Sequence, residues 1–281
     1  MHANHTTAAL LERGAERLAA ASSSARLDAE VLLAHVLGVA RARLRSHPEE
    51  TPGVAARRAY ESLLERRVAG EPLAYLVGYR DFWTLRLKVT PAVLVPRPET
   101  ELLVERALEA CMSDAAQVAD LGTGSGAIAL ALASERPGWH VVASDLSGAA
   151  LAVARQNAAE LGIHSVEFLQ GRWFEPLGTR RFDLVLSNPP YVSSADPVLS
   201  AAPLRFEPLP ALTTGGDALE DLLAIIAAAP AHLVAGGVLL LEHGADQAPA
   251  LARALVARGF GHVRSHRDLA GHERVTEARW S

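Results

Sequence analysis

The sequence has little of what several protein classes require. It holds one cysteine, Cys111, among 281 residues, so it can form neither an internal disulfide nor a cysteine-rich zinc site. No run approaches the roughly 18 apolar residues that span a bilayer, and the first residues contain no basic segment leading into an apolar core. These absences argue against a secreted, disulfide-stapled protein and against a membrane protein. We therefore expect a soluble, cytoplasmic protein.

Positive charge is also sparse. There are 27 Lys and Arg residues against 32 Asp and Glu residues, the formal net charge is -5, and Lys88 is the only lysine. Proteins that bind mainly by neutralising phosphates are usually basic, so the composition argues against direct nucleic-acid binding. The 49% hydrophobic and 21% charged content is ordinary for a globular chain. We expect a packed enzyme or binding protein, acting as a monomer.

Apolar periodicity divides the chain into three parts. In residues 1–72 apolar side chains recur three and four positions apart, which predicts a small helical bundle. Residues 73–98 contain short extended runs over 79–83, 85–89 and 93–95, broken by glycine and proline, which predict a β-hairpin linker. Residues 99–281 alternate strand and helix patterns, which predict an α/β fold with a parallel sheet covered by helices on both faces.

Finer expectations follow from the local pattern. Thr51 with Pro52 indicates the start of a helix, and Gly70 with Pro72 indicates its end. Strands are expected over residues 117–121, 140–145, 166–170, 182–187 and 237–242. Residues 261–267 and 274–280 lie too close in sequence for a crossover helix, so we expect them to pair as an antiparallel hairpin at the sheet edge.

A glycine-rich turn follows the first of these strands. Its glycines fall as Gly-x-Gly-x-Gly with Asp120 just before them, whereas a turn that seats a dinucleotide pyrophosphate needs Gly-x-Gly-x-x-Gly. An acidic entry suits a cationic ligand such as S-adenosylmethionine, which carries a sulfonium and an ammonium group. Asp145, which ends the next strand, is placed to accept from ribose hydroxyls. The predicted cofactor-binding residues are Asp120, Gly122, Thr123, Gly124, Ser125, Gly126 and Asp145.

An apolar strand stops abruptly at Asn188, Pro189, Pro190 and Tyr191. The prolines stiffen the turn, so the Asn188 side chain and the Pro189 carbonyl can point at one place. Two such acceptors match a planar NH2 group, whose nitrogen is a poor nucleophile because its lone pair is delocalised. Holding both hydrogens orients the nitrogen toward a methyl sulfonium, and Tyr191 offers a flat face. We predict that these four residues are catalytic and that Asn188 also borders the cofactor.

These segments resemble the PrmC/HemK family of release-factor glutamine methyltransferases, which have a Rossmann-like, seven-stranded class I S-adenosylmethionine-dependent methyltransferase domain. The resemblance covers nearly the whole chain. Residues 95–101 are similar to the family's segment at the entry to the catalytic domain, 120–126 to its cofactor loop, and 188–191 to its substrate-amide loop. Further similar segments are 205–208, 215–219, 242–244 with Gln247, and 268–271 with Arg274.

The resemblance implies a reaction and a substrate. The family transfers a methyl group from S-adenosylmethionine to the side-chain amide nitrogen of the glutamine in the Gly-Gly-Gln motif of class-one peptide chain release factors. S-adenosylhomocysteine is the other product, and no metal is implied. The resemblance also implies that the N-terminal helices dock the release factor. Since no base is needed to begin the reaction, we interpret His243 as a strand-end residue.

Other functions fit parts of the pattern. A glutamine methyltransferase of a ribosomal protein shares most of the segments, although the Pro-Glu-Thr-Glu run favours the release-factor branch. An adenine-N6 DNA methyltransferase presents the same tetrapeptide to the NH2 group of a flipped base, although the acidic composition disfavours DNA. A regulator that binds a nucleotide without chemistry is the alternative from another class.

One segment departs from the family. The family usually carries an acidic residue before the Trp-Phe pair that follows the third strand, and here Gly171 and Arg172 precede Trp173. The resemblance implies that Trp173 contacts the adenine, and it leaves open what Arg172 does. The roles of Arg97 and Glu99 also stay open between a loop brace and a substrate contact.

Overall fold

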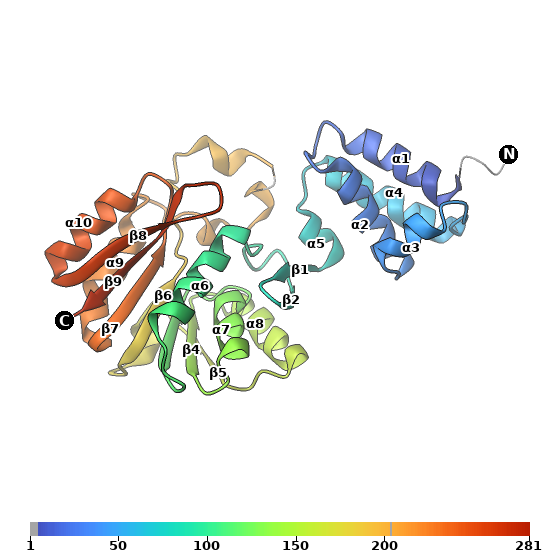
Figure 1. The fold of residues 1–281 in the computed structure, drawn as a ribbon. Helices are drawn as coiled ribbons and strands as arrows, with labels where there is room; N and C mark the ends of the chain where they lie inside the picture. Colours follow the sequence, from blue (N-terminus) through green and yellow to red (C-terminus); the bar gives the residue numbers. More distant parts are fainter. Residues whose placement is uncertain (1–4, 203) are drawn as a thin grey trace. The chain divides into compact units, whose positions relative to one another are not determined.

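The computed structural model describes residues 5–202 and 204–281, which divide into two compact units (Figure 1). The first, here called the helical unit, contains the residues up to Tyr79 together with Ser200–Phe206. The second, the sheet unit, contains Arg80–Leu199 and Glu207–Ser281. Each unit has a hydrophobic core of its own.

The helical unit is built from amphipathic helices whose apolar residues meet in one core. Leu10, Leu33, Tyr60 and Leu64 are fully buried there, which is what their three- and four-residue spacing predicts. An ion pair of 2.8 Å joins the Asp28 carboxylate to the Arg67 guanidinium in the same unit. The helices are α1 Thr7–Leu18, α2 Ala25–Leu37, α3 Arg41–Ser46, α4 Val54–Val68 and α5 Leu73–Val77.

Three local expectations were wrong. Helix α4 begins at Val54, not at Thr51 and Pro52, because the carbonyl of Gly53 accepts the first helical hydrogen bond, from the Arg57 amide at 3.0 Å. Residues 73–77, expected to belong to the hairpin linker, form the short helix α5. Val93 lies in a bend, with its amide donating to the Thr90 carbonyl, rather than in a strand.

The expected hairpin is present as β1 (Tyr79–Phe82) and β2 (Leu85–Lys88), which form a two-stranded sheet of their own. Phe82 and Leu87 are buried and join the core of the sheet unit. At the turn the Trp83 amide donates to Oε1 of Glu101 at 2.8 Å. The hairpin is therefore attached to the first helix of the sheet unit.

The sheet unit is built on seven strands in the order β5-β4-β3-β6-β7-β9-β8. Strands β5, β4, β3, β6 and β7 pair with one another in parallel, and β9 pairs antiparallel with both β7 and β8. The expected parallel sheet with an antiparallel hairpin at its edge is thereby confirmed. The strands are β3 Gln117–Leu121, β4 His140–Asp145, β5 Val166–Gln170, β6 Phe182–Ser187, β7 Leu233–Glu242, β8 Phe260–Arg267 and β9 Glu273–Trp280.

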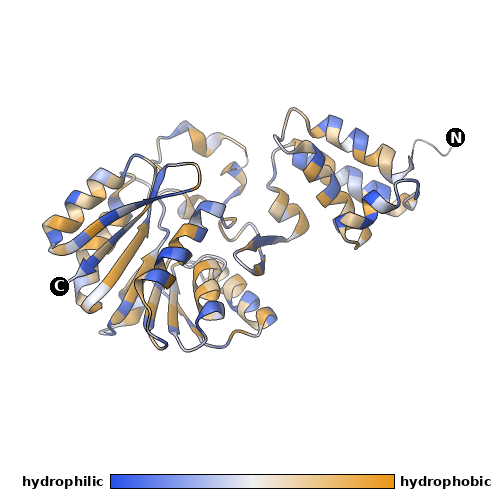
Figure 2. Ribbon diagram, in the orientation of Figure 1, coloured by the Kyte–Doolittle hydropathy of each residue, from blue (hydrophilic) through white to orange (hydrophobic). Residues whose placement is uncertain are grey.

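Helices cover both faces of this sheet. Neighbouring residues of a central strand enter different cores, as Val118 and Ala119 of β3 do, because side chains of a strand alternate between faces. Figure 2 shows β6 and β7 as hydrophobic and the β8–β9 hairpin as more hydrophilic. One core contains α6 Glu101–Ala110, α7 Ala127–Glu135 and α8 Gly148–Leu161, and the other contains α9 Glu220–Ala228 and α10 Ala248–Arg258.

Short 3-10 helices occupy several of the connections. They are η2 Pro98–Thr100, η3 Glu175–Leu177, η4 Pro197–Ser200, η5 Leu204–Phe206, η6 Leu209–Ala211 and η7 Ala229–Ala231. Within the described residues, every helix is too short or too polar to traverse a lipid bilayer.

Asn157 of α8 joins the hairpin to the loop after β3. Its Oδ1 accepts from the Lys88 amide at 2.7 Å, and its Nδ2 donates to the carbonyls of Lys88 and Ser125 at 3.1 and 2.9 Å. Asn157 is 1% exposed, so water cannot take its place as the hydrogen-bond partner of these backbone groups. Asn157 thus links Lys88 of the hairpin to Ser125 of the glycine-rich loop.

We expect Asn157→Leu to lower the free energy of unfolding of the sheet unit by about 3 kcal/mol, because it leaves buried backbone groups unpaired. Urea unfolding followed by tryptophan fluorescence measures this unit alone, since Trp83, Trp139, Trp173 and Trp280 all lie in it. Gln156→Leu, one position away on the exposed face, is the matched control. Equal stability of the two variants would show that the Asn157 bridge contributes nothing.

Candidate active site

The carboxyl ends of three adjacent strands form one site. In the sheet register Leu121 of β3 lies opposite Ser144 of β4 on one side and opposite Ser187 of β6 on the other. The Ser187 hydroxyl donates to the Leu121 carbonyl at 2.7 Å and ties two of these ends together. The glycine-rich loop, Asp145 and Asn188 therefore come together at the edge where open α/β sheets bind ligands.

Glycine is required in the loop after β3 because the backbone there turns left-handed. The φ angles of Gly122, Gly124 and Gly126 are +77°, +56° and +85°. A Cβ on Gly122 would lie 3.1 Å from a ring carbon of Trp173, whereas a Cβ on Gly124 would meet no described atom within 4 Å. The loop thus packs against an aromatic ring at one glycine and is open to a ligand at the next.

Asp120 lies at the base of this loop and is fully buried. The Thr123 hydroxyl donates to its Oδ2 at 2.6 Å, while Oδ1 has no hydrogen-bond partner among the described residues. Burial raises the pKa of Asp120 to about 7, against the opposing hydrogen bond from Thr123. A buried carboxylate with an unused oxygen favours a ligand that brings positive charge or a donor group.

Asp145 lies beside the loop, where two backbone amides hold its carboxylate. Its Oδ2 accepts from the Gly124 amide and its Oδ1 from the Ser147 amide, both at 2.8 Å. Burial raises its pKa, and these two hydrogen bonds oppose the shift. Each carboxylate oxygen has a further lone pair, so Asp145 is oriented to accept from hydroxyl groups of a ligand.

Trp173 is held in an unusual conformation next to the loop. Its φ is +47°, and its carbonyl accepts from the Ser144 hydroxyl at 2.8 Å. Its indole nitrogen donates to Oδ1 of Asp221 at 3.3 Å, and Arg172 donates to the same oxygen at 2.8 Å. The side chain of Arg172 therefore pairs with a buried acid from α9 that also fixes the tryptophan ring.

Asp221 is the residue of this cluster that the sequence analysis missed. It lies 49 positions after Arg172, in the first turn of α9 next to Glu220. Acidic residues are common at helix starts because they favour the helix dipole, so this position gave no signal of its own. The sequence analysis left the role of Arg172 open and did not point to this partner.

The Asn-Pro-Pro-Tyr loop after β6 is held by residues from three other segments. Nδ2 of Asn188 donates to Oγ1 of Thr100 at 3.1 Å, and the Tyr191 hydroxyl donates to Oε1 of Glu242 at 3.4 Å. Nε2 of Gln247 donates to the Tyr191 carbonyl at 3.1 Å. Pro189 is buried, and Pro190 is half-buried beside it.

Arg97, whose role the sequence analysis left open, and His243, interpreted there as a strand-end residue, are both structural in this arrangement. Arg97 donates to Oε1 of Glu207 at 2.5 Å, and Oε2 of the same buried acid accepts from the Val95 amide at 3.1 Å, so Arg97 braces a loop. His243 contacts the Gly244 carbonyl and the Thr276 hydroxyl, each at 2.8 Å, and burial lowers its pKa. Both residues hold backbone in place.

Comparison with known proteins agrees with this architecture. A model of the PrmC N-terminal domain matches residues 9–78, and a model of the methyltransferase small domain matches residues 98–218. A release factor glutamine methyltransferase of Pseudomonas aeruginosa is 49% identical over 92% of this chain and 94% of its own. One of Escherichia coli K12 is 44% identical over the same shares.

The chain belongs to the release factor glutamine methyltransferase family. The resemblance in the sequence is thereby confirmed, and so is the class of enzyme, a methyltransferase.

Solved structures extend this comparison to the fold of the family. A methyltransferase from Pyrococcus furiosus has a TM-score of 0.55 at 17% identity, over 78% of this chain and 98% of its own. The 16S rRNA N2 G1207 methyltransferase of T. thermophilus, solved with AdoMet and guanosine, has a TM-score of 0.54 at 23% identity, over 72% and 50%. At these identities the likeness concerns the Rossmann-like fold alone.

We expect Asp120 to make the stability of the ligand-free protein depend on pH. Its folded pKa of about 7 lies above the ordinary value near 3.9, so protonation stabilises the folded state as the pH falls below 7. Asp120→Asn does not titrate. Its stability advantage over the wild type should therefore shrink by up to about 1.4 kcal/mol per pH unit between pH 7 and pH 5.

Urea unfolding of both proteins at pH 8, 7, 6 and 5 measures this difference. Because all other groups are common to the two proteins, their titrations cancel in the comparison. A difference that stays constant across the series would mean that Asp120 is ionised throughout.

Proposed function

We propose that this chain transfers a methyl group from S-adenosylmethionine to the side-chain amide nitrogen of the glutamine in the Gly-Gly-Gln motif of class-one peptide chain release factors. The support that carries this proposal is the placement of Asn188, Pro189 and Tyr191 beside the glycine-rich loop, in a chain that matches release factor glutamine methyltransferases nearly end to end. Such a substrate locates the reaction in the cytoplasm.

The residues at the end of β3 and β4 fit the proposed cofactor. S-adenosylmethionine supplies an electrophilic methyl group on a sulfonium and leaves as S-adenosylhomocysteine. The unused oxygen of Asp120 provides negative charge at the base of the loop, and Asp145 provides acceptors for hydroxyl groups. The opening at Gly124 and the ring of Trp173 against Gly122 provide space and a flat apolar face.

The loop after β6 fits a planar amide. Because Nδ2 of Asn188 is engaged by Thr100, its Oδ1 remains as an acceptor, and the Pro189 carbonyl is the second acceptor. Holding both amide hydrogens of the glutamine fixes the plane of the NH2 group and the direction of attack. Burial raises the pKa of the Tyr191 hydroxyl, so it stays protonated and neutral beside that plane.

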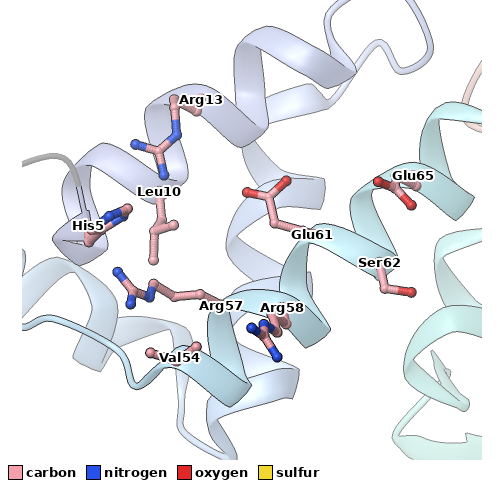
Figure 3. A pocket seen from close by; sticks show the side chains of 9 residues that line it. All are labelled: His5, Leu10, Arg13, Val54, Arg57, Arg58, Glu61, Ser62 and Glu65. Atoms are coloured by element: carbon pink, nitrogen blue, oxygen red, sulfur yellow. The ribbon is translucent and has the colours of Figure 1, made fainter.

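We propose that residues 1–72 dock the body of the release factor. A concavity of about 390 Å³ lies in the helical unit between α1 and α4. Figure 3 shows the side chains that line it. Arg13, Arg57 and Arg58 bring positive charge to it, and Glu61 and Glu65 bring negative charge. Charged rims of this kind select a protein partner and raise the rate of encounter.

A methyl-transfer assay with labelled S-adenosylmethionine tests the proposed function. We would offer a purified class-one release factor, its Gly-Gly-Ala variant, a ribosomal protein mixture and duplex DNA, and locate the methyl group by mass spectrometry. Label on the glutamine of the intact factor alone is the expected result. Label on ribosomal protein or on adenine would replace the substrate, and cofactor binding without label on any of them would contradict the proposal.

We expect Asn188→Ala to lower kcat about 100-fold or more while S-adenosylmethionine binds within about threefold of wild type, because the side chain holds the acceptor amide. Asp145→Ala should do the reverse and weaken cofactor binding about tenfold to 100-fold. Calorimetry measures binding and the labelled assay measures transfer, with Asp114→Ala on the exposed surface as the control. Parallel loss of both quantities in Asn188→Ala would refute its assignment to the acceptor.

We expect the double variant Arg57→Glu, Arg58→Glu to raise KM for the intact release factor about three- to tenfold, since exposed ion pairs contribute little each. KM for a short Gly-Gly-Gln peptide should not change, because the peptide lacks the docked surface. Steady-state kinetics with the two substrates measures both. An unchanged KM for the factor would remove this concavity from the docking surface.

A further inference from the structure

We infer that Asp221 is a positioning residue for the proposed cofactor: it holds the indole of Trp173 against the glycine-rich loop and thereby sets the affinity for S-adenosylmethionine. This inference rests on the proposed function and deepens it. It also gives a role to Arg172, which compensates the charge of Asp221. The three side chains meet at one atom, Oδ1 of Asp221.

Trp173 has a backbone conformation that it would not keep by itself. Its φ of +47° lies in the left-handed region, where a side chain as bulky as tryptophan is rarely found. Such a conformation persists only where the surrounding structure holds it. One such contact is on the backbone, where the hydroxyl of the fully buried Ser144 donates to the Trp173 carbonyl at 2.8 Å. That bond fixes the peptide group but leaves the ring free to rotate about its side-chain bonds.

Asp221 supplies the contact that holds the ring. Its Oδ1 accepts from the indole nitrogen of Trp173 at 3.3 Å, although the two residues lie 48 positions apart. An indole has a single N–H donor, so an acceptor at that edge restricts the rotation of the ring. On the loop side, a Cβ on Gly122 would lie 3.1 Å from a ring carbon of Trp173. The ring is therefore held between α9 and the loop after β3.

Arg172 makes the burial of Asp221 tolerable. The Asp221 side chain is 7% exposed, and a buried carboxylate is costly unless a cation pairs with it. The guanidinium of Arg172 donates to Oδ1 at 2.8 Å, while its own side chain remains 49% exposed. A neutral indole N–H could not balance the charge of the carboxylate. Because Arg172 and Trp173 are consecutive, one oxygen holds both residues of the bend.

The position of the ring bears on the proposed cofactor because the ring lies beside the open part of the loop. A Cβ on Gly124 would meet no described atom within 4 Å, whereas one on Gly122 would meet Trp173. An aromatic ring at this point offers the adenine a stacking face. A ring that is already in place avoids the cost of ordering it when the cofactor binds. Loss of Asp221 should therefore weaken cofactor binding and leave the transfer step unchanged.

Asp221→Ala removes the acceptor from the indole. We expect the dissociation constant for S-adenosylmethionine to rise about tenfold, the loss expected for one hydrogen bond to a charged group. At saturating cofactor kcat should stay within about threefold of wild type. Asp221→Asn keeps an oxygen that can accept from the indole, so its affinity should also stay within about threefold. Calorimetry measures binding and the labelled assay measures transfer.

Glu220→Ala is the matched control, because Glu220 is the neighbouring exposed acid in the same first turn of α9. It removes the same charge from the start of the helix, so it reports any effect of the helix dipole on binding. A selective loss of affinity in Asp221→Ala, with rescue by asparagine, supports the inference. An equal loss in Glu220→Ala, or failure of asparagine to rescue, overturns it.

A double-mutant cycle with Trp173→Phe separates positioning of the ring from a general structural role. Phenylalanine keeps an aromatic ring but has no N–H that Asp221 could hold. Asp221→Ala should therefore weaken cofactor binding in the wild-type background and change it less than about twofold in the Trp173→Phe background. Equal losses in the two backgrounds would show that Asp221 acts on another part of the structure and would overturn the inference.

Tryptophan fluorescence of the ligand-free protein tests the position of the ring independently of the proposed function. The spectrum of each Asp221 variant, minus that of the same variant carrying Trp173→Phe, isolates Trp173 from Trp83, Trp139 and Trp280. We expect Asp221→Ala to shift this emission to longer wavelength, because the released ring meets water, and Asp221→Asn to leave it in place. An unshifted emission in Asp221→Ala overturns the inference. A wild type whose variants show these shifts but which binds no S-adenosylmethionine would support the positioning of the ring and contradict the proposed function.

Discussion

The parallel pairing of β3 with β4 on one side and β6 on the other is the constraint on which the site depends. From β3 the chain passes outward through β4 to β5 and then returns to β6 across β3. The loops after β3, β4 and β6 therefore end at one edge of the sheet, although they lie more than 60 positions apart in the sequence between Leu121 and Asn188. Each loop then needs little more than a stiff turn to bring its polar groups together.

Two buried carboxyl groups give this edge its electrostatic character. Asp120 accepts a hydrogen bond from Thr123 of the glycine-rich loop and Glu242 accepts one from Tyr191, and burial raises the pKa of each carboxyl to about 7. Each has one oxygen without a partner among the described residues, which costs stability in the ligand-free protein. These two unpaired oxygens lie where a cofactor and an acceptor amide are proposed to bind, and not in the apolar cores.

Much of this arrangement could be predicted from the sequence, because strong local patterns determine it. The run over residues 182–187 is apolar and ends in two prolines, so both the strand and its end were predicted at the right residues. The left-handed turns after β3 require glycine, and the three glycines at these positions identified the turn in the sequence. The start of α4 was not, because Gly53 serves as its N-cap without any side-chain hydrogen bond.

Contacts between distant elements could not be predicted in this way. The sequence analysis left Arg172 without a role because its partner, Asp221, lies on another helix and looks like an ordinary helix start. Thr100 and Glu242 were noted only as parts of longer similar segments, since no local pattern says that their side chains contact the Asn-Pro-Pro-Tyr loop. These contacts require η2, β6 and β7 to be packed around the same point.

The direction of a hydrogen bond is further removed from the sequence than its existence. The letters Asn-Pro-Pro-Tyr specify an amide at the end of a strand, and the prolines specify a stiff backbone there. Neither says whether the oxygen or the nitrogen of Asn188 faces the open side. In the structure Nδ2 of Asn188 donates to Oγ1 of Thr100, which leaves Oδ1 as the acceptor, so a residue 88 positions away in the sequence takes part in setting the chemistry of the loop.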